Sequence, residues 1–383
     1  MDLLNAGVSK EDILKQTKSV VGVVDVSIEV SPGEIFVVMG LSGSGKSTLI
    51  RCINRLYEPT AGTILIDDVN VTQADRTELR NIRRSKVSMV FQHFALFPHK
   101  SVYENVEYGL KVQNVSEEER RDRSEEALQL IGLGGWGDYK PESLSGGMQQ
   151  RVGLARALAS GSEVLLMDEA FSALDPLIKR EMQDELLNIH DKLGRTIIFI
   201  THDLNEALKL GDRTAIMRDG SVEQIGNARQ IIDTPSSEYI HDFVRDVDRG
   251  RVLTLNAVIR QNRTLDAREF SIDAALSLLN SSEEDLCCLV TKDGKPERCL
   301  SSEAVQMAAD AGVVDYMDIG MPVQVAPVST LLQQALTPAS EGHCVVALNR
   351  LGELVGHADP TDILGALTVA DYTEAKSAIA GPG

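Results

Sequence analysis

A nine-residue segment, G-L-S-G-S-G-K-S-T at residues 40–48, constrains this chain more than any other. It follows the apolar run 35–39, rich in the β-branched and aromatic residues of a buried parallel strand, and residues 49–56 can continue as a helix. Its three glycines let the backbone N–H groups converge on one centre, where the helix N-terminus adds partial positive charge. A flexible glycine–serine turn would explain the composition but not the strand and helix around it. The segment therefore predicts a nucleoside triphosphate site, with Lys46 on the β- and γ-phosphates and the Ser47 hydroxyl on Mg²⁺.

The length and charge of the chain limit the remaining possibilities. The 383 residues are enough for two or three domains. The formal net charge of −19 argues against nucleic acid, whose phosphates require a basic face. No signal peptide is expected at the N-terminus and no stretch approaches the length of a membrane span, so any membrane role would go through a protein partner. The five cysteines lack metal-type pair spacing and are predicted to be reduced thiols of a cytosolic protein: Cys52, Cys287, Cys288, Cys299 and Cys344.

Strand-like and helix-like segments alternate over the first two thirds of the chain. Strands are expected at residues 20–30, 35–39, 62–67, 86–91, 164–167 and 196–200, and helices at 77–84, 116–132, 152–159 and after Asp175. Asp219-Gly220 lies between two further apolar runs and predicts a β-hairpin. This alternation is typical of an open α/β sheet, which binds its ligands beyond the carboxyl ends of the strands. From about Asp246 the pattern changes, and residues 251–379 contain two β/α-like stretches without a phosphate loop.

Three further segments carry chemistry. L-S-G-G-M-Q-Q-R at residues 144–151 places small residues before a helix, a second anion-friendly arrangement. The apolar strand 164–167 ends at Asp168-Glu169, and the strand 196–200 ends at T-H-D, which contains His202. Residues 91–108 hold five aromatic side chains, which are consistent with either a local core under a loop or a partner-binding surface: Phe91, Phe94, Phe97, Tyr103 and Tyr108.

Five elements stand in one order: the phosphate loop, Gln92, the 144–147 segment, the strand ending in Asp168-Glu169, and His202. Over residues 20–243 this set resembles the ATP-binding subunit of an ABC transporter. More narrowly, the phosphate loop and M-D-E-A-F-S-A-L-D-P-L-I at 167–178 are similar to those of the quaternary amine uptake class, whose best-known members import glycine betaine and proline betaine. Residues 323–367 resemble part of a pair of CBS motifs.

The resemblance implies an α/β fold: a P-loop NTPase domain of the ABC ATPase type, followed by a smaller α+β CBS-like pair. We expect the ATP-binding domain at residues 1–248, the tandem CBS-like regulatory or assembly domain at 249–370 and a tail at 371–383. The second region carries nine Lys and Arg against eighteen Asp and Glu from residue 251 onward, a balance of −9. We therefore expect it to support subunit assembly, without tight binding to anionic lipid or to AMP or ATP.

The resemblance also implies ATP and Mg²⁺ as ligands and a role for each motif residue. Glu169 would be the general base, His202 would hold the γ-phosphate and the attacking water, and Gln92 would sense the γ-phosphate. Mg²⁺ would be held by Ser47, Gln92 and Asp168. The phosphates would be held by Gly40, Ser42, Gly43, Ser44, Gly45, Lys46, Ser47 and Thr48. The ATP of a second subunit would be closed over by Ser145, Gly146 and Gly147, with Asp175 at the dimer seam.

The implied assembly is a homodimer of ATPase subunits, bound to a transmembrane permease and served by a periplasmic or lipid-anchored substrate-binding protein. The chain would lie on the cytoplasmic face of the inner membrane, and residues 91–108 would dock on the permease. Importers of trimethylamine N-oxide or choline are alternatives within the same class. A soluble ABC ATPase acting on ribosomes or DNA usually has two cassettes or a long coiled-coil insertion, and a purely regulatory module would not need Glu169 and His202.

The sequence departs from the family pattern in one place. ABC ATPases usually carry an aromatic residue about two dozen positions before the phosphate loop, where it stacks on adenine. Counting back leads to the region of Thr17, and no Phe, Tyr or Trp precedes Phe36. Adenine contacts are therefore expected from aliphatic side chains or from another part of the chain.

Overall fold

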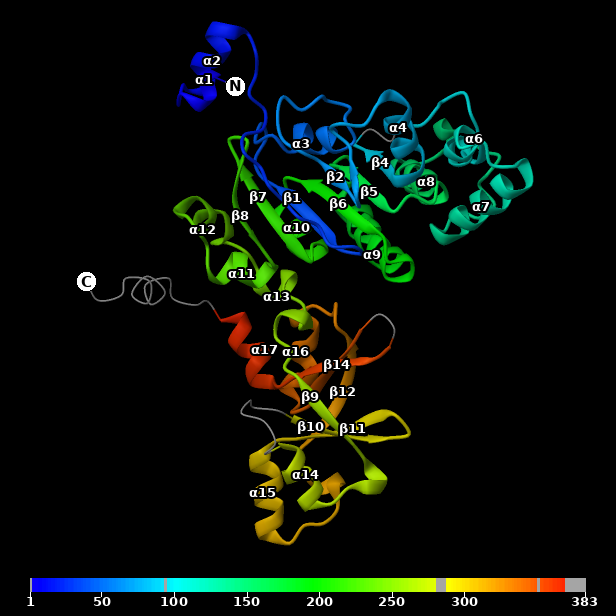
Figure 1. Cartoon of the computed structure of the whole chain (residues 1–383). Helices are drawn as coiled ribbons and strands as arrows, with labels where there is room; N and C mark the ends of the chain where they lie inside the picture. The colour runs from blue at the N-terminus through cyan, green and yellow to red at the C-terminus, as the bar shows by residue number, and fades with distance from the viewer. Residues whose placement is uncertain (1, 93–94, 280–286, 350–351, 369–383) are drawn as a thin grey trace. The chain divides into compact units, whose positions relative to one another are not determined.

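The computed structural model describes residues 2–92, 95–279, 287–349 and 352–368 (Figure 1). The chain divides into two compact units. The first contains residues 1–231 and 235–244, and the second contains residues 232–234 and 245–383.

A six-stranded sheet forms the centre of the first unit (Figure 1). Its first five strands are parallel and the last is antiparallel. Strand β1 is central and fully buried, as a strand that feeds a phosphate loop should be. In spatial order the strands are β4 (Val87–Phe91), β5 (Val164–Asp168), β6 (Thr196–Thr201), β1 (Ile35–Met39), β7 (Arg213–Arg218) and β8 (Ser221–Gly226).

Helices cover both faces of this sheet. Alternate residues of β1, Phe36 and Val38, pack in one core with Ile50 and Ile53 of α3 (Lys46–Ile53). The helices of the other face include α8 (Gly146–Ala159), α9 (Pro176–Leu193) and α10 (Leu204–Leu210), which are in contact with strands of the sheet or with one another. The other helices of the first unit are α1 (Asp2–Asn5), α2 (Lys10–Thr17), α4 (Arg76–Asn81), α5 (Val102–Val106), α6 (Tyr108–Val112), α7 (Glu117–Leu130) and α12 (Glu238–Val244); α11 (Ala228–Asp233) begins in it, and a π-helical turn, Ile82–Lys86, follows α4.

Two expected strands differ from the structure. Residues 20–30 form irregular backbone although Val26, Ile28 and Val30 pack against the core. The alternating pattern therefore predicted burial correctly, but the segment does not form the ladder that defines a strand. In the expected edge strand 62–67, only β2 (Leu65–Ile66) is extended, and it pairs with β3 (Val69–Asn70).

The Asp219-Gly220 hairpin is confirmed. These residues join β7 to β8 and have φ angles of 48° and 80°. Positive φ at both central positions is the requirement of the type I′ turn, which matches the twist of the flanking strands.

The second unit contains the same β-α-β-β-α arrangement twice. In each copy the first two strands are parallel and the last two are antiparallel. The first copy has β9 (Asn262–Asp266), α14 (Ile272–Leu279), β10 (Cys287–Lys292), β11 (Lys295–Leu300) and α15 (Ser302–Ala311). The second has β12 (Met321–Pro327), α16 (Leu332–Ser340), β13 (Cys344–Leu348), β14 (Leu354–Ala358) and α17 (Pro360–Leu367), and α13 (Arg249–Val252) precedes both.

The cysteines depart from the expectation of five free thiols. Cys287 on β10 and Cys299 on β11 form a disulfide, with Cα atoms 6.3 Å apart, whereas Cys52, Cys288 and Cys344 are free. The expectation was wrong for this pair because spacing alone does not show which strands are neighbours. A second positive-φ turn, at Asp293-Gly294, folds β11 back along β10 and brings the two cysteines together.

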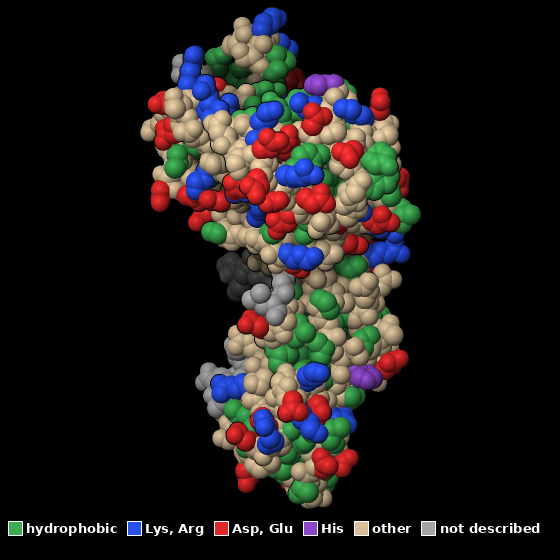
Figure 2. Space-filling view, turned by 90° about the vertical axis from the view of Figure 1, so that its right-hand side faces the viewer, with side chains coloured by type: hydrophobic (Ala, Val, Ile, Leu, Met, Phe, Trp, Pro, Cys, Tyr) green, Lys and Arg blue, Asp and Glu red, His purple; other side chains and the backbone are tan. Residues whose placement is uncertain are grey.

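No helix among the described residues is both long enough and apolar enough to cross a lipid bilayer. On the face drawn in Figure 2, acidic and basic side chains are interspersed. In the aromatic segment, the rings of Phe97 and Tyr108 pack at a tilt of 53° with centroids 4.6 Å apart, and Tyr108 is 39% exposed. Phe94 lies outside the described residues. The aromatic segment therefore contributes both to local packing and to the surface.

Candidate nucleotide site

The phosphate loop leaves β1 and leads directly into α3, which begins at Lys46, three residues before the expected start. Gly40 and Gly45 have φ angles of 149° and 101°, a region that disfavours other residues. A Cβ atom at Gly40 would collide with the backbone oxygen of Met217, and one at Gly45 with that of Gly22. The loop therefore needs glycine at both positions, for its conformation and for its close packing.

Lys46 is 4% exposed, and its Nζ donates hydrogen bonds to the loop's own carbonyl oxygens, at 2.7 Å to Gly40 and 3.0 Å to Leu41. Burial lowers the pKa of Lys46, while the negative charges of Glu169 and Asp168 oppose that shift. The loop thus holds a cation close to two carboxylates.

The first of these carboxylates is Asp168, at the end of β5. It is 4% exposed and accepts a hydrogen bond from the Ser47 hydroxyl at 2.9 Å and one from Arg51 at 3.1 Å. A hydroxyl and a carboxylate held together beside a phosphate loop are oxygen ligands of the kind that Mg²⁺ uses in phosphoryl-transfer sites. Ser47 and Asp168 therefore fit the expected metal position.

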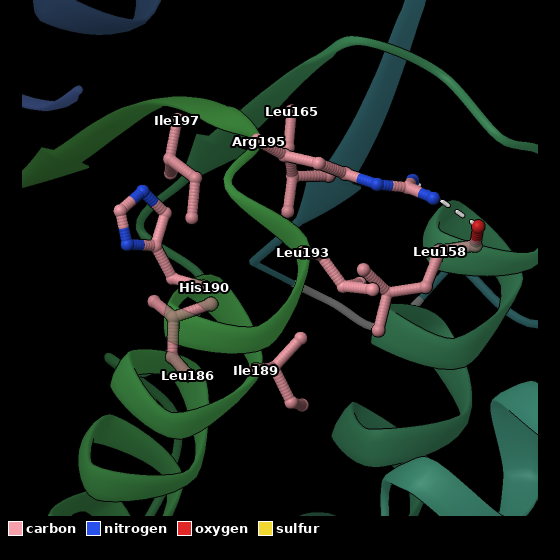
Figure 3. A pocket seen from close by; sticks show the side chains of 8 residues that line it. All are labelled: Leu158, Leu165, Leu186, Ile189, His190, Leu193, Arg195 and Ile197. Carbon is pink, nitrogen blue, oxygen red and sulfur yellow. Dashed lines mark hydrogen bonds between the residues drawn. The ribbon is translucent and has the colours of Figure 1, made fainter. Parts of the chain in front are cut away.

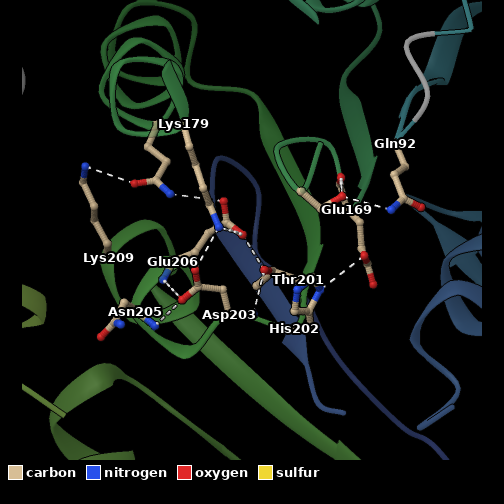
Figure 4. Close-up of polar contacts among 11 residues, drawn as sticks. Gln92, Glu169, Lys179, Thr201, His202, Asp203, Asn205, Glu206 and Lys209 are labelled. Carbon is tan, nitrogen blue, oxygen red and sulfur yellow. Dashed lines mark hydrogen bonds and ion pairs between the residues drawn. The ribbon is translucent and has the colours of Figure 1, made fainter. Parts of the chain in front are cut away.

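Glu169 and His202 face each other from the ends of neighbouring strands (Figure 4). His202 Nδ1 lies 3.2 Å from Glu169 Oε2, and the Glu169 carboxylate and His202 ring are 20% and 56% exposed. Glu169 has a φ of 47°, and its N–H donates to the backbone oxygen of Ile200 at 3.1 Å. The carboxylate is therefore partly exposed, on a backbone that is hydrogen-bonded to the next strand.

Gln92 follows β4 and is linked to the same turn. Its Nε2 donates to Ser172 Oγ at 3.0 Å, and the Ser172 hydroxyl donates to the backbone oxygen of Glu169 at 2.9 Å (Figure 4). Strands β4, β5, β6 and β1 are consecutive in the sheet, so their carboxyl ends bring Gln92, Asp168, Glu169, His202 and Lys46 to one edge.

A polar network behind His202 fixes the start of α10. Lys179 Nζ contacts the carboxylates of Asp203 at 2.8 Å and Glu206 at 3.6 Å, and Glu206 also accepts from Thr201 (Figure 4). Burial raises the pKa of Asp203, but Lys179 and two backbone N–H groups outweigh it and lower that pKa overall. For Glu206 burial prevails, and its pKa is raised. The network anchors the backbone on which His202 is carried.

The 144–147 segment forms the N-terminus of α8. Ser145 caps this helix by accepting from the N–H of Met148 at 3.3 Å, and a Cβ at Gly147 would lie 2.6 Å from Ile178 of α9. Asp175 caps α9 in the same manner. Within the described parts of the chain, no hydrogen bond or ion pair joins Ser145, Gly146, Gly147 or Asp175 to the phosphate loop.

Two site residues were missed from sequence. Arg51 lies four residues after Ser47, and the helical period places both on the side of α3 that reaches Asp168. Ser172 lies three residues after Glu169 in the same turn. Both positions could have been found by asking which polar side chains share a face or a turn with a motif residue.

An apolar pocket lies at the opposite end of the strands (Figure 3). Leu165 and Ile197, near the starts of β5 and β6, line it together with Leu186 and Ile189 of α9. Its one polar link drawn in the figure is the hydrogen bond from Arg195 to the backbone oxygen of Leu158, at 3.2 Å. None of the nucleotide-site residues lines this pocket.

Comparison with known proteins agrees with this geometry. The sequence model of the family described as ABC transporter matches residues 23–172. The glycine betaine transport ATP-binding protein OpuAA of Bacillus subtilis is 46% identical over 348 residues, which cover 91% of this chain and 83% of that protein. The trimethylamine N-oxide transport system ATP-binding protein TmoW of Pelagibacter ubique is 46% identical over 267 residues, covering 70% and 78%.

A solved dimeric ATP-binding cassette in a post-hydrolysis state with ADP and Pi superposes with a TM-score of 0.50 and 38% identity, covering 54% of this chain and 90% of that one. The motif order, the convergence of the motif residues at one sheet edge and these similarities agree. The chain therefore belongs to the ABC transporter family, as an ATP-binding subunit with ABC-type ATPase activity.

Proposed function

We propose that this chain hydrolyses ATP to drive an importer of a quaternary amine such as glycine betaine or proline betaine. The observation that carries the proposal is the Glu169–His202 pair at 3.2 Å, beside the Ser47–Asp168 pair at 2.9 Å, on the edge that also carries Lys46. The similarity to OpuAA supports the substrate class because it extends over 91% of this chain and so includes most of the second unit.

Trimethylamine N-oxide is the second candidate. TmoW is as identical to this chain as OpuAA is, but the match covers only 70% of the chain. In such importers the binding protein and the permease select the substrate, so the residues of the ATP site do not decide between the two, nor do they decide against choline.

In hydrolysis, the loop N–H groups and Lys46 bind the phosphates. Ser47 and Asp168, with Gln92, would hold Mg²⁺, which when bound neutralises negative charge on the phosphate oxygens. Glu169 then accepts a proton from the attacking water, and His202, which its carboxylate contacts, holds that water and the γ-phosphate in line. Arg51 donates to Oδ2 of the Asp168 carboxylate, and Ser47 donates to Oδ1.

Two copies of the chain form a homodimer in which each ATP site is shared between the subunits. Ser145, Gly146 and Gly147 of one subunit close over the ATP of the other, with Asp175 at the dimer interface. Ser145 lies at the exposed N-terminus of α8, a 14-residue helix whose partial positive charge suits a phosphate. This assignment explains why the segment has no described link to the phosphate loop of its own chain.

The permease would dock on residues 91–108 of the ATPase, on the cytoplasmic face of the inner membrane, and a periplasmic or lipid-anchored protein would deliver the substrate. Tyr108 keeps 39% of its surface exposed, and Gln92 connects this segment to the hydrolysis turn through Ser172. Binding of the γ-phosphate at Gln92 can thereby influence the docking surface.

The dimer is tested by mixing two inactive variants, Ser145→Arg and Lys46→Ala. A mixed dimer contains one site with both lesions and one site with neither, so ATPase activity should return on mixing, whereas neither variant alone should show it. Each variant mixed with itself is the matched control. If the mixture stays inactive although mixed dimers are shown to form, the proposal that each shared ATP site can hydrolyse ATP without the other is wrong.

Transport is tested in proteoliposomes that contain this chain with its permease and the binding protein. ATP hydrolysis should rise when the binding protein is loaded with glycine betaine or proline betaine, and the loaded substrate should accumulate in the lumen. Stimulation by trimethylamine N-oxide in place of the betaines would select the second candidate. Absence of coupling with any of these amines would contradict the proposal.

A further inference from the structure

Three buried side chains in the second unit bring metal-ligand atoms together. Cys287 on β10, Cys299 on β11 and His357 on β14 offer two sulfurs and a ring nitrogen that all lie within 4.8 Å of one another. The three residues are 4%, 2% and 2% exposed. The cysteines belong to the first β-α-β-β-α copy and the histidine to the second, so the group links the two copies (Figure 1).

The histidine has an unmet bonding requirement. His357 Nδ1 is buried and has no hydrogen-bond partner among the described residues. Buried polar atoms are nearly always bonded because desolvation without a partner costs free energy. His357 thus pairs a buried ring nitrogen that has no partner with a ring nitrogen, Nδ1 or Nε2, close to two sulfurs, and simple packing does not explain this combination.

A second group overlaps the first. Cys299, Cys344 and Asp359 also offer ligand atoms within 4.8 Å of one another, and Asp359 Oδ1 is likewise buried without a partner. Arg260 forms an ion pair with Asp362, on the same turn as Asp359. Polar and sulfur-containing side chains thus gather around Cys299, and the other buried residues of this core, Leu289 and Val346, are aliphatic.

We propose that, with the disulfide reduced, Cys287, Cys299 and His357 bind a zinc-like divalent cation. Thiolate and imidazole are the donors that Zn²⁺ takes in proteins, whereas Mg²⁺ and Ca²⁺ take oxygen. Two thiolates and a neutral imidazole balance the charge of the ion, so the buried site carries no net charge. The cation and the disulfide are alternative states of the same sulfurs, and a reducing environment favours the thiol state that binds the cation.

The consequence is a cross-link between the two copies of the repeat. Binding should raise the unfolding temperature of the second unit because only the folded unit brings the three ligands together. It should leave basal ATP hydrolysis unchanged, since the three ligands belong to the second unit and the hydrolytic residues to the first.

The test uses the full chain, purified in a phosphine reductant and titrated with Zn²⁺ while Mg²⁺ is in excess. After gel filtration the wild type should retain one zinc ion per chain by elemental analysis. Cys299→Ser and His357→Leu should each weaken zinc binding more than tenfold. Cys288→Ser is the matched control, because Cys288 is the next residue of β10 and is equally buried, but packs in the other core.

A second measurement does not depend on the folding of a variant. Co²⁺ added to the reduced wild type should produce the thiolate-to-metal absorption of a bound, low-coordinate cobalt site, and Zn²⁺ should displace it. Three outcomes would each overturn the proposal. They are a reduced wild type that binds no zinc or cobalt, a Cys299→Ser or His357→Leu variant that binds zinc like the wild type, and a Cys287–Cys299 disulfide that resists the reductant while the protein is folded.

Discussion

The turn after β5 carries the proposed general base, Glu169, and a conservative substitution can separate this role from nucleotide binding. Glu169→Gln keeps the shape of the side chain but removes the proposed proton acceptor, so ATP turnover should fall by about 10²–10⁴. ATP should still bind, because Lys46 and the loop are untouched, and should now hold two subunits together. Steady-state phosphate release and size-exclusion chromatography with ATP measure the two effects. Glu181→Gln removes an exposed carboxylate of α9 and is the control. Near-normal ATP turnover in Glu169→Gln would contradict the assignment of Glu169 as the general base.

Much of the site could be predicted at this scale. Lys46, Gln92, Asp168, Glu169 and His202 each directly follow a buried strand or lie in the loop after one, so chain order alone placed them at one edge. Arg51 and Ser172 were not predicted, because their roles depend on which way a side chain turns across two elements. For Arg51 that information lies in the packing of α3 against β5, and for Ser172 it lies in the adjacency of the ends of β4 and β5.

At the scale of elements, the α9–α10 network gives the first unit a pH dependence. Burial raises the pKa of Glu206 above its ordinary value, so the native state holds this proton more tightly than the unfolded state does. Its contribution to stability is therefore present at low pH and is lost as pH rises through the raised pKa. Glu206→Gln should gain thermal stability relative to the wild type between about pH 4.5 and neutrality.

Thermal unfolding of both proteins across that pH range checks this sign. Glu181→Gln, which removes an exposed carboxylate from the same helix α9, controls for the general effect of losing one negative charge. A difference between Glu206→Gln and the wild type that is constant with pH, or that shrinks as pH rises, would show that Glu206 is not the titrating group.

Secondary-structure elements were predicted well where a local sequence pattern determines them. They were predicted less well where the structure depends on which strands pair with each other. The Asp219-Gly220 hairpin follows from two residues that tolerate positive φ. Residues 20–30 alternate like a strand but form no ladder, because burial of one side of a segment does not supply a neighbouring strand. The Cys287–Cys299 pair was missed for the corresponding reason, since it depends on the adjacency of β10 and β11.

For the whole molecule, the division into units predicts that hydrolysis survives loss of the second unit. The second segment of the first unit ends at Val244, so a chain that stops after Asp248 retains every proposed hydrolytic residue. Its basal ATPase activity should stay within about twofold of the full chain, a change of about 0.4 kcal/mol in the barrier. A loss of more than tenfold in a truncated chain with native circular dichroism would show that hydrolysis needs the second unit.

The acidic balance of the second unit bears on lipid binding. A basic residue near an anionic leaflet contributes only about 1 kcal/mol, and here acidic residues outnumber basic ones two to one from residue 251 onward. We expect the full and truncated chains to sediment equally poorly with phosphatidylglycerol vesicles at low salt. Stronger sedimentation of the full chain, or calorimetric binding of AMP by the full chain alone, would contradict the assembly role proposed for this unit.

At Glu169, whose backbone is left-handed, the residue that the proposed catalysis requires differs from the residue that would stabilise the turn most. A residue other than glycine at a φ of 47° costs the fold on the order of 1 kcal/mol, and glycine would remove that cost together with the proposed proton acceptor. A laboratory screen for heat resistance alone should therefore enrich Glu169→Gly, whereas selection for uptake should eliminate it. The turn would then mark a position where the most stable sequence and the working sequence are different.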